Sequence, residues 1–294
     1  MSDIVENIAR ASGCEIRHDA ATRILYATDG SMHQVEPRAV AFPRTAAQTA
    51  AVMRAAAEAG VPISPRGAGT GLTGGALGDG LILDMSRYNR QIADFDREAR
   101  TVRGGAGVVL DQLNAFLEPH GLMFGPDVAT SSRATLGGMI NNNSSGARAP
   151  RYGTTSEHLI SLEAALPDGR IVELGRERSG MTEHIAAFDA LVQREAPLIR
   201  ERFHQEICKR WPGYGLDRYL RAPGDLCKLV AGSEGTLATV FSAELRLVPL
   251  PASKGIGLAF FDSVAEAMRA TVTLSKLGAA AIEHIDDMLF DQTK

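Results

Sequence analysis

The sequence predicts an α+β fold, in which a strand–helix–strand unit precedes a mainly antiparallel part. Short apolar runs flank a capped helix in residues 37–86, alternating apolar and polar residues follow, and a further strand pair meets at Asp168-Gly169. Parallel strands need a long crossover connection, whereas antiparallel strands can be joined by a tight turn. We therefore expect two lobes, at about residues 37–90 and 91–250.

The first lobe is predicted from its central helix, in residues 45–60. Thr45 is a suitable N-cap, Gln48 stands three residues later as in a capping box, and Gly60 takes the C′ position at which helices end. Apolar runs typical of short strands lie on both sides of this helix, at 39–42, 61–65 and 80–86. The sequence therefore predicts a βαβ unit followed by a third strand.

The second lobe is predicted to alternate strand pairs with helices. An antiparallel pair is expected in residues 91–107 and a second strand pair in 159–174. After a charged helical stretch at 176–221, residues 225–251 are expected to supply a helix end, a Gly-rich turn and one long strand. Between them, a helix in 108–117 carries one apolar face, formed by Val109, Leu113, Phe116 and Leu117.

Two flanking segments complete the predicted organisation. Residues 1–36 are expected to be an N-terminal extension. The prolines at Pro249 and Pro251 close a long apolar strand and mark a domain boundary. Residues 251–294 are expected to contain a strand, a helix, a second strand and the start of another helix, and thus to begin a further domain.

Composition excludes several classes of function. A net charge of −4, without a basic stripe, does not fit a protein that neutralises nucleic-acid phosphates. No apolar stretch approaches the roughly 20 residues that cross a bilayer, and the acidic start differs from a signal peptide; we expect a cytoplasmic protein. Cys14, Cys208 and Cys227 are widely spaced, so we expect reduced thiols and no metal site.

The run "PRGAGTGLTGGALGDG" at 65–80 is the densest glycine stretch of the chain. Gly69, Gly71 and Gly74 match G-x-G-x-x-G, but a strand follows them instead of the helix that a Rossmann fingerprint opens. No Gly-Lys-Ser/Thr follows either, which excludes a P-loop. The remaining interpretations are a solvent loop and an anion-binding nest of successive N–H groups, for which a dinucleotide diphosphate is the natural ligand.

A second polar segment, at 125–155, is rich in Gly, Ser, Thr and Asn and shows little apolar periodicity. Long segments of this kind are usually functional or disordered. Asn141, Asn142 and Asn143 fit either a site or a surface turn. His158 precedes a buried strand and is interpreted as a hydrogen-bonded structural residue and not as a proton carrier. Arg148, Arg151 and Tyr152 fit contacts with a substrate carboxylate, although a solvated surface position is expected for at least one of the two arginines.

His284 stands beside acidic residues in "IEHIDD" and superficially resembles part of a metal cluster. Adjacent helical positions point to different faces, so we do not interpret this stretch as a metal site.

Three motifs, in this order, resemble one family. They are "PRGAGTGLTGG" at 65–75, the segment "GPDVATSSRATLGGMINNNSSGARAPRYGTTSEHLISLEAALPDGR" at 125–170, and "LVAGSEGTLATVFSAELRLVPLP" at 229–251. Together they resemble the FAD-linked oxidases of the vanillyl-alcohol oxidase/p-cresol methylhydroxylase type. Within that type they are most similar to the D-2-hydroxyacid dehydrogenases, which include the glycolate oxidase FAD subunit, D-lactate dehydrogenase and D-2-hydroxyglutarate dehydrogenase.

The resemblance implies a two-lobed FAD-binding domain of the p-cresol methylhydroxylase type at 37–250, followed by the start of a substrate (cap) domain at 251–294. Some members tether the flavin to a histidine in the first loop, where this chain has Thr70; non-covalent FAD is therefore expected. The cofactor-binding residues that the resemblance implies are Arg66, Gly67, Ala68, Gly69, Thr70, Gly71, Leu72, Thr73, Pro126, Asp127, Thr135, Gly137, Gly138, Asn141, Ser145, Gly146, Gly235 and Val240.

The resemblance also implies a reaction, the oxidation of a D-2-hydroxy acid to a 2-oxo acid with transfer of electrons to a separate acceptor. In the family, the general base and the carboxylate ligands usually come from a later part of the chain, so no catalytic residue is assigned. We expect the N-terminal part of a larger enzyme, which holds flavin, reduces it slowly or not at all, and self-associates through apolar residues at 258–261 and 279–285. The alternatives are an FAD-binding module or subunit without catalysis, and a flavin reductase of the cell-wall precursor type.

Overall fold

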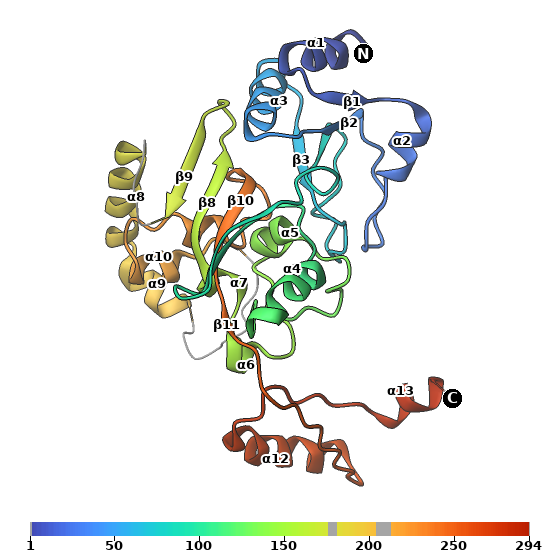
Figure 1. The fold of residues 1–294 in the computed structure, drawn as a ribbon, viewed down its shortest axis with the longest axis vertical. Helices are drawn as coiled ribbons and strands as arrows, with labels where there is room; N and C mark the ends of the chain where they lie inside the picture. The colour runs from blue at the N-terminus through green and yellow to red at the C-terminus, as the bar shows by residue number, and fades with distance from the viewer. Residues whose placement is uncertain (1, 176–180, 204–212, 294) are drawn as a thin grey trace.

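The computed structural model describes residues 2–175, 181–203 and 213–293. Figure 1 shows two lobes side by side and a C-terminal segment that extends away from both. The mixed α+β architecture agrees with the sequence prediction. Cys208 and parts of the predicted helical stretch lie outside the described residues.

The first lobe contains a four-stranded sheet in the order β1-β2-β4-β3. The strands β2, β3 and β4 are parallel to one another, while β1 pairs antiparallel with β2. The elements of this lobe are α1 (Ser2–Ser12), β1 (Glu15–Arg17), α2 (Ala20–Leu25), β2 (Ala39–Phe42), α3 (Ala46–Glu58), β3 (Ile63–Arg66) and β4 (Leu81–Asp84). The predicted βαβ unit corresponds to β2, α3 and β3, and β4 is the predicted third strand.

Local signals account for the ends of α3. Thr45 Oγ1 accepts a hydrogen bond from Gln48 N at 3.1 Å, and Gly60 has φ +64°, as the sequence predicts. The reciprocal half of the capping box differs, because the Gln48 side chain accepts from Arg44 N at 2.9 Å, one residue before the N-cap. Both ends of the helix are therefore set by residues within five positions of it.

The N-terminal residues are part of the first lobe's core. Val5 and Ile8 of α1 and Cys14 are buried in one apolar cluster with Val52 and Ala56 of α3. Figure 1 shows α1 lying directly against α3. The boundary at residue 37 stays a prediction, but residues 2–17 contribute one helix and one strand to this lobe.

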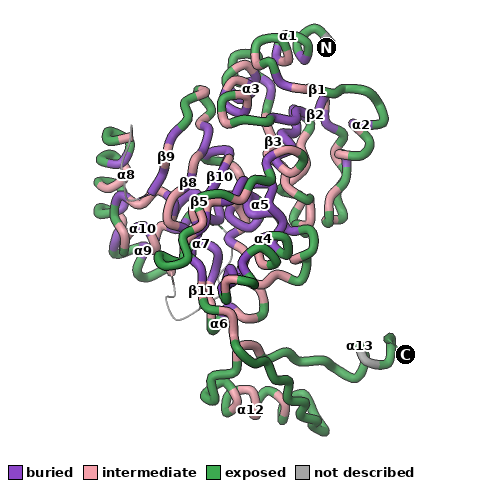
Figure 2. The backbone as a smooth tube through the Cα atoms, in the orientation of Figure 1, coloured by how far each residue is buried: buried purple, intermediate pink, exposed green. Residues whose placement is uncertain are grey.

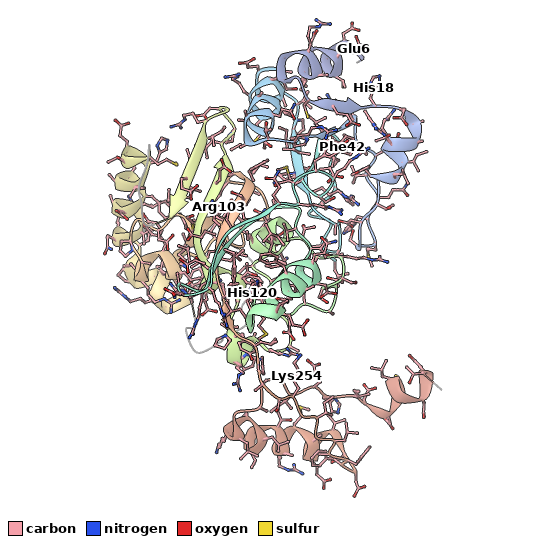
Figure 3. All side chains as sticks on the ribbon, in the orientation of Figure 1. Glu6, His18, Phe42, Arg103, His120 and Lys254 are labelled. Atoms are coloured by element: carbon pink, nitrogen blue, oxygen red, sulfur yellow. The ribbon has the colours of Figure 1, made fainter. Side chains whose placement is uncertain are left out.

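The second lobe is built on a five-stranded antiparallel sheet in the order β5-β6-β10-β8-β9. Its strands are β5 (Ile92–Asp96), β6 (Thr101–Gly105), β8 (Leu159–Ala165), β9 (Ile171–Gly175) and β10 (Thr239–Arg246). One face of the sheet packs on the largest apolar cluster, with Leu113 and Ile140 from the helices and Leu162 from the sheet. The other face is polar and carries Arg103, labelled in Figure 3.

Short helices surround this sheet. They are α4 (Leu110–Leu117), η1 (Glu118–His120), α5 (Leu136–Asn142), α6 (Ala149–Tyr152), α7 (Thr155–His158), α8 (Thr182–Arg194), α9 (Ala196–Arg202), α10 (Leu216–Arg221) and α11 (Cys227–Val230). In addition, β7 (Leu122–Met123) pairs with β11 (Val248–Pro249) in a two-stranded sheet. The face predicted for α4 is correct except at Phe116, which is 39% exposed and packs edge-on against Phe95.

The C-terminal segment contains α12 (Val264–Leu274), η2 (Ser275–Leu277) and α13 (Asp287–Gln292). The strands predicted near residues 256–261 and 279–283 are wrong: the described chain has none beyond β11. A strand needs an edge to pair with, and this segment lies away from both sheets (Figure 1). Figure 2 shows it as almost entirely exposed. No helix in the described residues is long and apolar enough to cross a membrane.

Candidate cofactor-binding site

The glycine loop leaves the end of β3 and returns to the sheet at β4. Within the described chain, the backbone N–H groups of residues 67–76 donate to no acceptor, although ten successive amides lie in this stretch. Leu77 is the first residue after them whose N–H is bonded, to Gly74 O at 3.1 Å. Successive N–H groups without an acceptor are the donors from which anion-binding nests are built.

A buried hydroxyl group faces the start of this loop. A Cβ atom on Gly67 would overlap Thr135 Oγ1, so only glycine allows the loop to approach α5 this closely. The buried oxygens without a hydrogen-bond partner in the described chain include Thr135 Oγ1, Asn141 Oδ1 and Ser233 Oγ on this side of the loop, and Asp29 Oδ2 behind it. Buried polar atoms normally have a partner. The three on this side fit hydrogen-bonding groups of a ligand.

The turn at 232–235 closes the other side of the site. Glu234 N donates to Asn141 O at 2.9 Å, and Asn142 Nδ2 donates to Glu234 Oε1 at 2.9 Å. A Cβ on Gly75 would lie 3.3 Å from Glu234 Oε2, and one on Gly235 would lie 3.4 Å from the Pro65 ring. The loop, α5 and this turn therefore meet in one place, although they are far apart in the sequence.

Ser233 and Glu234 are candidate site residues that were not named from the sequence, and Asn142 is one for which the sequence left a surface turn open. Burial raises the pKa of the Glu234 carboxyl group, and the hydrogen bond from Asn142 opposes this effect. Glu234 also has φ +53°, a left-handed conformation that is uncommon for a residue with a side chain. The signal in the sequence is the pattern Gly232-Ser-Glu-Gly235, which marks a tight turn in front of a long strand.

The predicted residues at 126–146 lie along a second wall. The Asp127 carboxylate binds Arg148, with Nε at 3.0 Å, and also accepts from Arg148 N at 3.1 Å. Asp127 N donates to Ser145 O at 3.3 Å, and Asp127 forms an isolated parallel bridge with Gly146. These contacts fix the backbone at 126–127 against 145–146.

Three of the predicted residues have mainly structural contacts here. Gly137 packs against Ala106, where a Cβ would lie 2.8 Å from the alanine methyl group. Val240 is buried in the core of the second lobe. Arg66 points to the back of the loop, where Nη2 donates to Thr28 O at 2.8 Å. A direct contact of these residues with a cofactor stays a prediction.

The residues considered for a substrate carboxylate, and the nearby His158, differ in their exposure and in their hydrogen-bond partners. Arg148 is paired with Asp127, whereas Arg151 is exposed and its guanidinium lies 5.7 Å from the Tyr152 ring centroid. His158 is buried, with Nε2 2.7 Å from Tyr152 O and Nδ1 3.1 Å from Arg246 O. It is hydrogen-bonded in the fold, as the sequence predicts.

The described thiols are unreactive. Cys14 and Cys227 are free and buried, and burial raises the pKa of Cys14 to about 11 and also raises the pKa of Cys227. Within residues 2–175, 181–203 and 213–293, no group of three or more His, Cys, Asp or Glu side chains is arranged to hold a metal ion.

Comparison with known proteins gives the family and the relatives that the chain is similar to. Residues 37–175 match the FAD binding domain family. The chain is 38% identical to a D-2-hydroxyglutarate dehydrogenase of Pantoea ananatis over 92% of this chain and 28% of that protein. It is 32% identical to a D-lactate dehydrogenase of Archaeoglobus fulgidus over 85% of this chain and 49% of that protein. The chain thus spans less than a third of the length of the D-2-hydroxyglutarate dehydrogenase that it matches.

Solved structures give the same fold. Alkyldihydroxyacetonephosphate synthase superposes with a TM-score of 0.58 at 19% identity, covering 81% of this chain and 38% of that chain. The BBE-like 1 protein of Physcomitrella patens superposes with a TM-score of 0.61 at 16% identity, covering 84% of this chain and 44% of that chain. At these identities the likeness shows the fold alone, and it confirms the predicted two-lobed type.

Proposed function

We propose that this chain, whose residues 37–175 match the FAD binding domain family, supplies the FAD-binding part of a D-2-hydroxyacid dehydrogenase. The observation that carries the proposal is the row of ten backbone amides without an acceptor at 67–76, next to the unpartnered Thr135 hydroxyl group. This donor set fits a diphosphate. The names of the relatives at 38% and 32% identity support the substrate class.

The loop amides would hold the FAD diphosphate. A hydrogen bond to a charged group contributes about 1.5–3 kcal/mol, so four or five of these amides are enough for tight binding without a covalent link. The Thr135 hydroxyl group would donate one more hydrogen bond to the diphosphate, whereas Asn141 Oδ1 would accept a hydrogen bond from a hydroxyl or N–H group elsewhere on the cofactor. Thr70 stands where a tethering histidine occurs in other flavin loops, which supports non-covalent FAD.

When bound, FAD supplies a two-electron acceptor, which suits the oxidation of a 2-hydroxy acid to a 2-oxo acid. We propose that the electrons then pass to a separate acceptor. Arg151 is an exposed cation that follows the wall at 126–146 in the chain and would attract the substrate carboxylate. We also propose, from the sequence, that the protein is cytoplasmic.

The second candidate function is an FAD-binding module without catalysis of its own. It is favoured by one observation, that the unpaired amides at 67–76 account for cofactor binding without any group that acts on a substrate. The two candidates share the cofactor and differ in whether a substrate reduces it.

We further propose self-association through the C-terminal segment. Ile256 is 93% exposed and Phe260 is 90% exposed, and α12 presents further apolar side chains to solvent. Exposed apolar patches of this kind usually mark contact surfaces.

One experiment separates the two functions. The FAD-loaded chain is mixed anaerobically with the D- and L-forms of 2-hydroxyglutarate and lactate, and the oxidised-flavin band is followed. Slow reduction by D-acids alone is the result expected for the dehydrogenase. Bound FAD that no acid reduces supports the binding module. A chain that binds no FAD contradicts both candidates.

A further inference from the structure

Residues 26–33 lie behind the glycine loop and outside the matched domain at 37–175. Gly30 N donates to Gly69 O at 2.7 Å, which ties this segment to the middle of the loop. The segment itself is ordered by Asp29, whose Oδ1 accepts from Ser31 N at 2.8 Å. The loop therefore has a second side, formed by residues that precede the domain.

The same segment also binds both strands from which the loop emerges. Arg66, at the end of β3, donates through Nη2 to Thr28 O at 2.8 Å and through Nη1 to Tyr26 O at 3.4 Å. Its guanidinium lies 5.2 Å from the Tyr26 ring centroid. The Tyr26 hydroxyl group donates to the carboxylate of Asp84, at the end of β4. Tyr26 thus connects the two ends of the loop.

The contact between the segment and the loop is close. A Cβ on Gly30 would lie 3.0 Å from both Thr70 O and Gly71 O, and a Cβ on Gly74 would lie 3.1 Å from the His33 ring. The carbonyl groups of residues 69–71 therefore face the segment. In a trans peptide, a carbonyl group and the next N–H group point in opposite directions. The N–H groups of residues 70–72 consequently face away from the segment, toward the open side of the loop.

We propose that residues 26–33 are a positioning element, which holds the carbonyl groups of residues 69–71 so that the amides of residues 70–72 face the FAD diphosphate. This inference rests on the proposed FAD site. It assigns Gly30 and Arg66 a common role, because both act on the loop from behind. Arg66 then influences FAD through the loop backbone and does not itself bind phosphate.

The first test compares Gly30→Val with Gly257→Val. Valine at 30 pushes the carbonyl groups of Thr70 and Gly71 away, whereas valine at 257 places its Cβ in open space on the C-terminal segment. Titration of FAD into the cofactor-free proteins should give a dissociation constant at least tenfold higher for Gly30→Val and within twofold of wild type for Gly257→Val. A folded Gly30→Val protein with wild-type affinity overturns the proposal.

The second test does not depend on FAD. In cofactor-free Arg66→Gln, hydrogen exchange measured by mass spectrometry should be faster in the peptide covering 26–35, because the side-chain bonds to Tyr26 O and Thr28 O are lost. If Arg66 only binds phosphate, exchange in this peptide will equal that of wild type, which contradicts the positioning role. Should wild type bind no FAD, the proposed function fails and this exchange measurement still decides the inference.

Discussion

The glycine loop and the C-terminal segment are both exposed, yet they differ in what surrounds them. The loop at 67–76 has unpaired N–H groups on one side and is held on the other by Gly30 and Arg66. The segment after Pro251 has apolar side chains in solvent and lies apart from both lobes (Figures 1 and 2). One region is a preorganised polar surface, and the other is an apolar surface that the described chain does not cover.

From this difference we infer that cofactor binding and surface association rest on separate parts of the chain. The candidate cofactor site combines groups from 67–76, 135–142 and 232–235, all within the two lobes. The segment beyond 251 lies apart from these groups (Figure 1). Changes in one region should therefore leave the function of the other unaffected. Two predictions test this independence, and two more concern the candidate cofactor site itself.

The largest effect is expected from Gly71→Val. A Cβ at Gly71 meets no atom within 4 Å, and its φ is not in the left-handed region, so the cofactor-free fold tolerates the side chain. The new methyl groups would occupy the space where the diphosphate binds. We expect FAD affinity to fall at least about 100-fold, or about 2.7 kcal/mol, with an unchanged melting temperature of the cofactor-free protein. Fluorescence titration and thermal unfolding measure the two quantities.

Gly257→Val is the matched control, since it also places a Cβ in open space but on the C-terminal segment. It should bind FAD as wild type does. Retention of FAD by Gly71→Val would remove the loop from the binding site. Gly69→Val is less informative, because Gly69 has φ +67° and a Cβ there would lie 2.7 Å from Arg66 Nη2, so the fold itself would be strained.

The second largest effect is expected on self-association through the C-terminal segment. Replacing Ile256 and Phe260 together by serine removes two almost fully exposed apolar side chains. We expect self-association to weaken at least about tenfold, since burial of an apolar side chain of this size contributes about 1.5–3 kcal/mol. Sedimentation velocity over a concentration series measures the change. Unchanged association, or a loss of FAD affinity in the same variant, would contradict the separation of the two regions.

Thr135→Val is expected to have smaller effects, which differ in sign between the stability of the cofactor-free protein and its affinity for FAD. The hydroxyl group of Thr135 is buried without a partner, and valine has nearly the same shape. Removing an unsatisfied buried group should leave the cofactor-free protein equally or more stable, by up to about 1 kcal/mol. FAD affinity should nevertheless fall by about threefold to tenfold. A parallel loss of stability and affinity would indicate a structural role instead.

The smallest effect is a pH dependence at Glu234. Because burial raises the pKa of this carboxyl group in the folded protein, folding favours its protonated form. Its contribution to stability is therefore lost as pH rises from the unfolded pKa through the raised folded pKa. Glu234→Gln keeps an oxygen acceptor for Asn142 and cannot ionise. Its melting temperature should exceed that of wild type at pH 7, and the difference should shrink toward pH 4.

The sequence predicted best what local chemistry determines. The helix α3 could be bounded from Thr45 and Gly60 because a cap and a left-handed residue act within one turn. The hairpin at Asp168-Gly169 could be predicted for the same reason, and Gly169 has φ +80°. The glycine loop was recognised from composition and from the strand that follows it.

What depends on distant contacts could not be predicted. The helix α5 begins in "TLGGMINN", whose two glycines are poor helix formers, and it forms because Leu136 and Ile140 are buried and Gly137 packs on Ala106. The contacts of Arg66 with Tyr26 and Thr28 lie about forty residues away along the chain. The strands expected after Pro251 have suitable residues but no neighbouring edge.

The most direct test of the account is an equilibrium titration of FAD into the cofactor-free wild-type chain. It should be followed by acid precipitation of the loaded protein and measurement of free flavin in the supernatant. The account predicts saturation at one FAD per chain and complete release of the flavin by acid. Absence of saturable binding, or flavin that stays with the precipitated protein, would contradict the non-covalent diphosphate site at residues 67–76.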